Sequence, residues 1–179
     1  MKKLKILPIS ITAVLTAAIL FGGWFAYRHY GVEKPLDRVA NSVKGVDSAR
    51  VEMENGLVKV KVQLDPNANL GEVYRKIKQD GASEIGAKQL ELEPSAAASN
   101  ELLEKAWSYS LFDVAEAMEN HKYSGIRDAM EGLSKQFPGV TVKTDMDETN
   151  VYISMKDGNA AKFVVLPREP VMLGAWPNA

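Results

Sequence analysis

The chain has 179 residues, a net charge of −1 and no cysteine. This near-neutral charge argues against a nucleic-acid-binding protein, which usually carries a basic excess. The absence of cysteine excludes disulfides, thiolate metal sites, thiol nucleophiles and the lipid-carrying cysteine of a bacterial lipoprotein.

Residues 6–27 predict a membrane anchor, because the stretch has no charged side chain. As a helix it is about 33 Å long, enough to cross a hydrocarbon core of about 30 Å. A cleaved signal peptide is the alternative, but no A-x-A site follows the apolar run. We therefore expect an uncleaved, single-pass anchor in the plasma membrane.

The short head of residues 1–5, which carries three lysines, favours a signal anchor with its N-terminus inside and the soluble domain outside the cytoplasm. The count of positive charges alone is nearly tied, since three basic residues follow between 28 and 38. Ala18, Gly22 and Ala26 share one helix face. Small residues at this spacing let two helices pack closely, so this face is a candidate for helix association.

Residues 28–35 are interpreted as a linker, and residues 36–93 as a module in the order helix, strand, strand, helix, strand. Asn55-Gly56 separates two alternating runs, which is a strong signal of a β-hairpin. One face of this hairpin is aliphatic and the other is charged, so we expect a sheet with one covered side. Asn69 is expected to cap the second helix, with Glu72 three residues on.

Residues 94–99 are interpreted as a linker or hinge, because they hold a proline and three alanines. Residues 100–166 predict a helical segment capped by Asn100, with a break at Ser124-Gly125, followed by a three-stranded meander. The tail, residues 167–179, holds three prolines and is expected to be irregular.

Two stretches share one plan, a helix, a Gly-Val junction and an alternating hairpin. They are residues 38–64 and 127–155. A duplication of one helix-hairpin unit is one explanation, and chance similarity of two α+β hairpins is the other. The predicted fold class is α+β, with an antiparallel sheet and helices on one face.

The order of elements in residues 36–93 resembles the BON domains and the ring-building motifs of bacterial secretion and sporulation assemblies. The residues that carry the resemblance are Val39, Val43, Val51, Met53, Asn55-Gly56, Val58 to Leu64, Val73, Ile77, Leu90 and Leu92. The resemblance covers about a third of the chain and implies a role in envelope binding or assembly, without catalytic residues.

The sequence contains two histidines, and neither lies in a metal-binding pattern. His29 is interpreted as an interfacial residue, and His121 as a residue that favours the negative end of a helix. No serine lies in a G-x-S-x-G elbow. The acidic cluster of Asp145, Asp147 and Glu148 is interpreted as a polar turn, with a cation site as the alternative. We therefore expect no catalytic residues, no metal and no cofactor.

Tyr109 and Phe112 fall off the apolar stripe that contains Trp107. They are candidates for a partner surface, or for contact with a second sheet. The basic residues Lys59, Lys61, Arg75, Lys76 and Lys78 are candidates for a patch that contacts anionic lipid or wall polymer.

These features favour a membrane-anchored, envelope-facing, non-enzymatic assembly or binding protein. Its expected partners are the membrane and either a second copy or an envelope protein, with no nucleic acid. The alternatives are a ligand-sensing regulator that acts through a membrane partner, and a cell-wall hydrolase that uses carboxylates or His121.

Overall fold

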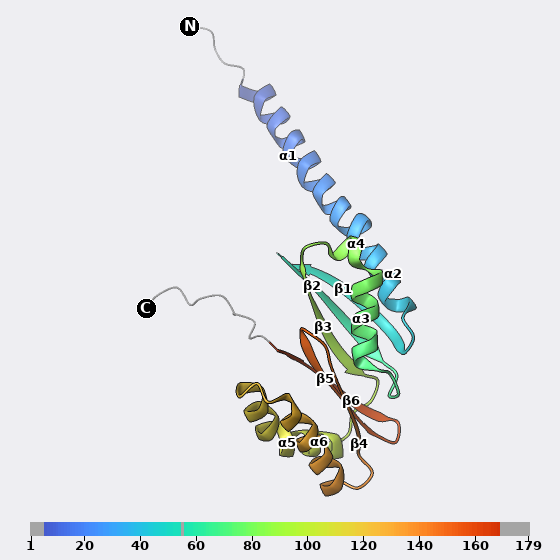
Figure 1. Cartoon of the computed structure of the whole chain (residues 1–179). Helices are drawn as coiled ribbons and strands as arrows, with labels where there is room; N and C mark the ends of the chain where they lie inside the picture. Colours follow the sequence, from blue (N-terminus) through green and yellow to red (C-terminus); the bar gives the residue numbers. More distant parts are fainter. Residues whose placement is uncertain (1–5, 55, 169–179) are drawn as a thin grey trace.

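A computed structural model describes residues 6–54 and 56–168, in which a long N-terminal helix leads into an α+β body (Figure 1). The helical elements are α1 (Ile6–Arg28), η1 (His29–Glu33), α2 (Lys34–Ser42), α3 (Leu70–Asp80), α4 (Ala82–Ile85), α5 (Glu101–Glu119) and α6 (Tyr123–Gln136). The strands are β1 (Val46–Glu54), β2 (Leu57–Leu64), β3 (Gln89–Ala96), β4 (Thr141–Met146), β5 (Asn150–Asp157) and β6 (Ala160–Pro167).

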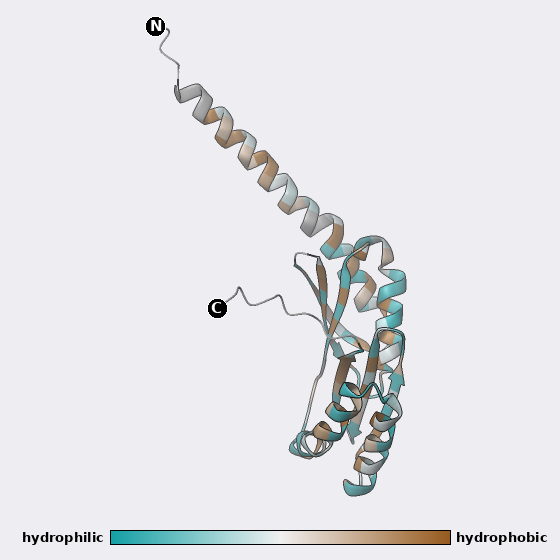
Figure 2. Ribbon diagram, turned by 60° about the vertical axis from the view of Figure 1, so that its left-hand side comes forward, coloured by the Kyte–Doolittle hydropathy of each residue, from teal (hydrophilic) through white to brown (hydrophobic). Residues whose placement is uncertain are grey.

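Among the described residues, one helix near the N-terminus is long and apolar enough to cross a membrane. Figure 2 shows mostly brown and white ribbon along α1, whereas the ribbon of the body mixes teal and brown. The predicted linker over residues 28–35 is helical, because η1 and α2 continue the helix into the fold. Pro35 lies at the start of α2, and its missing N–H removes one backbone hydrogen bond where the π-helical turn η1 meets α2. Val32 packs against the core, so helix rather than flexible chain joins α1 to the body.

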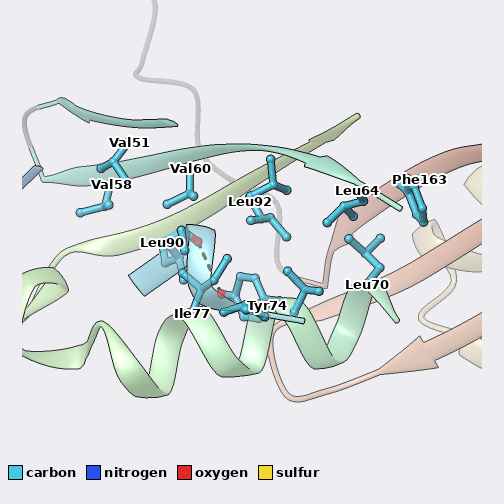
Figure 3. Close-up of a cluster of buried hydrophobic side chains, with 14 of the residues drawn as sticks. Val51, Val58, Val60, Leu64, Leu70, Tyr74, Ile77, Leu90, Leu92 and Phe163 are labelled. Atoms are coloured by element: carbon cyan, nitrogen blue, oxygen red, sulfur yellow. Dashed lines mark hydrogen bonds between the residues drawn. The ribbon is translucent and has the colours of Figure 1, made fainter. Parts of the chain in front are cut away.

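The first sheet has the order β1-β2-β3, and the predicted hairpin joins β1 to β2 in antiparallel pairing. Its inner face carries buried aliphatic residues, which α2 and α3 cover (Figure 3). Its outer face carries charge pairs, such as Glu52 with Lys61 at 2.8 Å and Lys59 with Glu91 at 3.7 Å. The prediction of an antiparallel sheet fails at β3, which runs parallel to β2. A crossover through α3 brings the chain back to the starting end of β2, as parallel pairing requires.

The second helical segment begins as predicted, since Oδ1 of Asn100 accepts a hydrogen bond from the N–H of Leu103 at 2.9 Å. The break falls earlier than Ser124-Gly125. It lies at His121, which has φ of +51°, a region that histidine enters more readily than most residues. Gly125 is inside α6, where a Cβ would lie 3.1 Å from the Cβ of Ala117 on α5. The glycine therefore lets the two helices approach closely.

The second sheet is the predicted meander, with the antiparallel order β4-β5-β6. One of its faces packs on α5 and α6 through Val151, Ile153 and Met155. The prediction of helices on one face is incomplete here. The opposite face packs on the first module, residues 36–93, through Tyr152 and Phe163. Strand β5 is thus buried on both sides, which explains its nearly continuous apolar sequence.

The two modules share a buried contact between two rings and an exposed ion pair. The rings of Tyr74 on α3 and Tyr152 on β5 lie 5.6 Å apart, and Nη2 of Arg75 lies 2.9 Å from Oδ2 of Asp145. The predicted linker at residues 94–99 is half strand, because Pro94–Ala96 continue β3 beside Val62–Leu64. The predicted irregular tail starts too early at residue 167, because Pro167 belongs to β6 and Arg168 still bonds to Thr149; from position 169 onward the tail lies outside the described residues.

Two helix-to-strand junctions have the same local geometry. In each, the residue directly after the helix is non-helical, and the residue two positions later is a glycine with positive φ. The residue after that glycine donates its N–H to the carbonyl of the non-helical residue at 3.1 Å. The residues are Val43, Gly45 and Val46 after α2, and Phe137, Gly139 and Val140 after α6. The shared plan read from the sequence is therefore present in the backbone.

Candidate functional site

A cleft of about 780 Å³ lies between the first module, residues 36–93, and the meander. It lies between β3 and β6, the strands at the facing edges of the two sheets. At one end of the cleft, the start of β6 contacts the segment that follows β3, where the N–H of Ala161 donates to the carbonyl of Ala98 at 3.0 Å. The lining comes from α3, α4, β3, the β4–β5 turn and the end of β6. These lining residues are Tyr74, Lys78, Ala82, Ile85, Gly86, Lys88 to Leu92, Glu148 to Asn150, Val165 and Pro167.

The free edge of β3 presents unpaired backbone groups to the cleft. The N–H of Gln89 donates to the carbonyl of Gly56 at 3.1 Å, which places Gln89 on the side of β2. Because successive residues of a strand direct their backbone groups to opposite sides, those of Leu90, Leu92 and Pro94 point to the free edge. Proline lacks an N–H and is confined to such edges, so Pro94 fits this assignment.

The free edge of β6 follows from the same reasoning. The N–H of Arg168 donates to the carbonyl of Thr149 at 2.8 Å, so Arg168 and every second residue before it face β5. Phe163, Val165 and Pro167 therefore direct their backbone groups to the opposite side, toward the cleft. Among the described residues no backbone ladder joins β3 to β6, so two open edges share one cleft.

Tyr74 forms the floor of the cleft beside β3. Its side chain is 4% exposed, and its hydroxyl donates to the carbonyl of Leu90 at 3.5 Å (Figure 3). The Nζ of Lys78 lies 5.8 Å from the centroid of the Tyr74 ring. One carbonyl of the β3 edge is thus weakly covered by the tyrosine.

The opposite wall is the β4–β5 turn, which is held by a partly buried hydrogen-bond network. Oδ1 of Asp147 accepts from the N–H groups of Thr149 and Asn150, each at 2.8 Å. Its Oδ2 accepts from the hydroxyl of Tyr152 at 2.6 Å. Burial acts to raise the pKa of Asp147, but the hydrogen bonds from Tyr152, Thr149 and Asn150 outweigh it and lower the pKa. The turn is therefore a wall hydrogen-bonded around an ionised carboxylate.

Arg168 closes the same wall at the end of β6. Its Nη1 donates to the carbonyl of Asp147 at 2.8 Å, and its guanidinium lies 4.6 Å from the centroid of the Tyr123 ring. The Nε of Arg168 is buried without a hydrogen-bond partner among the described residues. The side chain holds the end of β6 against the turn.

The charges that line the cleft are balanced. Two lysines, Lys78 and Lys88, stand with two glutamates, Glu91 and Glu148. Among residues 6–54 and 56–168, no group of three His, Asp or Glu side chains is placed to hold a metal ion. The cleft can therefore form hydrogen bonds through the backbone edges of β3 and β6, next to apolar side chains such as Ile85, Leu90 and Val165.

The sequence-predicted site residues lie elsewhere. Ala18, Gly22 and Ala26 are exposed on α1, and a Cβ at Gly22 would have no neighbour within 4 Å. Tyr109 and Phe112 are exposed on α5, by 57% and 79%, so neither faces a second sheet. Tyr109 contacts the edge of the Phe137 ring at 5.7 Å between centroids. Both sets remain candidate contact surfaces.

The predicted charged clusters are dispersed by the fold. Asp145 pairs with Arg75 across the modules, and Asp147 serves the turn, so the acidic residues do not converge. Lys59 and Lys61 lie on the outer face of the first sheet, whereas Lys76 and Lys78 lie on α3 on its other side. The basic residues therefore form no single patch.

The sequence reasoning missed the cleft, although one signal was available. Pro94 and Pro167 lie near the ends of β3 and β6, and a proline in a strand indicates an edge. What the sequence lacked was the packing that brings these two edges together.

Comparison with known proteins identifies no relative of this chain from which a function could be taken. No protein-family model matches the chain, and no curated protein matches it in sequence.

Proposed function

We propose that this chain is a membrane-anchored, non-enzymatic binding protein that holds an extended peptide segment of an envelope protein between β3 and β6. The observation that carries the proposal is the pair of unpaired strand edges that share the cleft. A strand edge recruits an extended peptide through main-chain hydrogen bonds, and pockets for alternate side chains supply specificity.

An added strand would extend one of the two sheets. Neighbouring strands lie about 4.8 Å apart, and β3 and β6 approach too closely over part of their length to admit a strand between them, so a peptide in the open part of the cleft would hydrogen-bond the edge of β3 or the edge of β6. Side chains of such a peptide would meet Ile85 and Leu90 on one wall and Val165 on the other. The balanced charge of the lining favours a peptide of mixed or apolar composition over a polyanion.

The anchor supports a site of action close to the bilayer. We infer that the N-terminus lies inside and the body outside the cytoplasm, from the basic head at residues 1–5. Because α1, η1 and α2 form one helical run that packs on the core through Val32, the cleft is held near the membrane surface. The resemblance of the first module to envelope assembly modules points the same way.

Site-specific photo-crosslinking in living cells tests the proposal. A photoreactive residue at Lys88 or at Val165, both in the cleft lining, is expected to capture one discrete partner. The same residue at Lys143, exposed on the far edge strand β4, is the matched control. The proposal is wrong if the cleft positions capture nothing beyond what position 143 captures.

The inferred orientation has its own test. Since the chain has no cysteine, a single Lys143→Cys variant carries one thiol on an exposed position. A membrane-impermeant maleimide should label this thiol in intact cells. Labelling only after the cells are lysed would place the body in the cytoplasm and overturn the orientation.

A further inference from the structure

The first sheet has two edges, and side chains of α2 occupy one of them. The N–H of Val51 donates to Oδ1 of Asp37 at 2.6 Å, and the N–H of Ala49 donates to Oδ1 of Asn41 at 2.9 Å. Nδ2 of Asn41 donates in return to the carbonyl of Ala49 at 3.0 Å. The edge of β1 is therefore hydrogen-bonded at these two residues, whereas β3 keeps an open edge toward the cleft.

Within the cleft, β3 offers more backbone groups than β6. Leu90 and Leu92 both line the cleft, and each directs an N–H and a carbonyl to the open edge. The lining residues of β6 are Val165 and Pro167, and the proline has no N–H to donate. A segment that binds through main-chain hydrogen bonds is therefore expected to pair with β3.

Two lysines of the lining lie where β3 begins. Lys88 directly precedes the strand. Nζ of Lys78 on α3 lies 5.8 Å from the centroid of the Tyr74 ring, and the hydroxyl of that ring donates to the carbonyl of Leu90. Neither lysine forms an ion pair within residues 6–54 and 56–168. The start of β3 thus carries two ammonium groups beside an apolar surface.

The two carboxylates of the lining do not neutralise these lysines. Oε1 of Glu91 lies 3.7 Å from Nζ of Lys59, on the outer face of the sheet. Glu148 belongs to the β4–β5 turn, on the opposite wall of the cleft. The balanced charge of the cleft is therefore separated in space, positive at the start of β3 and negative at the turn.

On the basis of the binding role described under the proposed function, we propose that the partner segment pairs with the edge of β3 and places an acidic side chain beside Lys78 and Lys88. Residues that face each other across two strands lie on the same side of the sheet, and alternate residues of a strand share that side. The positions of the segment that meet Leu92, Leu90 and Lys88 are therefore two residues apart. The segment recognised by the cleft has two alternate apolar residues and, two positions beyond them, a carboxylate.

Charge reversal in the full chain, in living cells, tests this inference. A photoreactive residue at Val165 reports capture of the partner, and Lys78→Glu with Lys88→Glu is introduced beside it. We expect capture to fall roughly tenfold or more, because the carboxylate of the segment would then meet two others. Lys143→Glu, which changes an exposed lysine on β4, is the matched control and should leave capture unchanged.

Two further variants separate charge from folding and from chance. Lys78→Gln with Lys88→Gln removes the attraction without adding repulsion, so capture should fall by an intermediate amount while the thermal midpoint stays close to that of the unsubstituted chain. Mass spectrometry of the adduct identifies the captured segment. Changing the acidic residue of that segment to lysine should restore its capture by the chain that carries Lys78→Glu and Lys88→Glu.

The outcomes distinguish this inference from the proposed function. Equal capture by the lysine variants and the unsubstituted chain overturns the inference and leaves the peptide-binding role standing. A captured segment that contains no acidic residue overturns it as well. Absence of any capture at Val165 in the unsubstituted chain refutes the binding role itself, and this inference with it.

Discussion

The hydroxyl of Tyr152 on β5 donates a hydrogen bond to Oδ2 of Asp147 at 2.6 Å, and this bond links the buried face of the meander to the wall of the cleft. The Tyr152 side chain is 1% exposed and also packs against Tyr74 of the first module. Burial raises the pKa of Tyr152 well above its ordinary value, and the bond to Asp147 adds to the rise. One residue therefore ties the inter-module contact to the turn.

The first prediction concerns stability at alkaline pH. Above pH of about 10 the tyrosine ionises in the unfolded chain but stays neutral in the folded one, so stability falls as the pH rises. Tyr152→Phe should remove this part of the loss. At neutral pH it should cost about 1–2 kcal/mol, because Asp147 loses a hydrogen bond.

Thermal or denaturant unfolding of the detergent-solubilised chain across this pH range measures both effects. Tyr109→Phe is the matched control, since that residue is 57% exposed. An unchanged alkaline slope in Tyr152→Phe would contradict the assignment.

The second prediction contrasts two glycines inside helices. A Cβ at Gly71 would collide with the Asp145 carboxylate and approach Cδ2 of Tyr152 to 3.1 Å, whereas a Cβ at Gly132 has nothing within 4 Å. Gly71→Ala is expected to destabilise the fold by about 1–2 kcal/mol, because buried Tyr152 cannot give way. Gly132→Ala should stabilise it by about 0.5–1 kcal/mol through helix propensity alone. Equilibrium unfolding compares them, and effects of the same sign would contradict the packing of α3 on β5.

Much of the fold was predictable because the chain marks it locally. Asn69 and Asn100 cap their helices, and Gly56, with φ of +79°, lies in the turn between β1 and β2, each through chemistry within a few residues. The parallel pairing of β3 was not predictable in this way. It depends on where α3 delivers the chain, and alternation in Leu90 and Leu92 is the same for either direction.

The site was harder to predict than the fold, because its two edges are far apart in sequence. Leu92 and Val165 each lie in a run whose pattern predicts a strand. They lie close together in space because Tyr74 of the first module packs on Tyr152 of the meander. The continuity of the N-terminal helix was missed for a related reason. Gly31 and Pro35 indicate a break, yet the contact of Val32 with the core stabilises the helix through them.

The third prediction tests the two matching helix-to-strand junctions. Gly45 has φ of +88° and Gly139 has φ of +104°, so alanine should be strained at both, at about 1–2 kcal/mol each. The cost should be larger at Gly45, where a Cβ would lie 2.9 Å from that of Ala68. Adding Ala68→Gly to Gly45→Ala should recover part of the loss, whereas it should not help Gly139→Ala. Denaturant midpoints measure this, and equal recovery in both would argue against a local clash.

The fourth prediction separates two helix caps that look alike in sequence. The Oδ1 of Asn69 and of Asn100 each accept from the third N–H of their helix, at 3.1 and 2.9 Å. Asn69→Asp keeps that acceptor and places a charge at the positive end of α3, so stability should hold or rise slightly. Asn100→Asp should destabilise the fold, because Nδ2 of Asn100 donates to Oδ2 of Asp157 at 2.8 Å and two carboxylates would then meet.

The decisive variant for this cap combines Asn100→Asp with Asp157→Asn, which reverses the donor and the acceptor. We expect the double variant to recover most of the stability lost in Asn100→Asp, because an amide again faces a carboxylate across the start of α5. Asn69→Asp with Asp157→Asn is the control, in which the effects of the two single substitutions should simply add. Urea unfolding of the three single and two double variants forms the test, and additive effects in the Asn100→Asp pair as well would mean that Asn100 and Asp157 act independently. Since β5 ends at Asp157, recovery would show that the cap also fixes α5 on the meander.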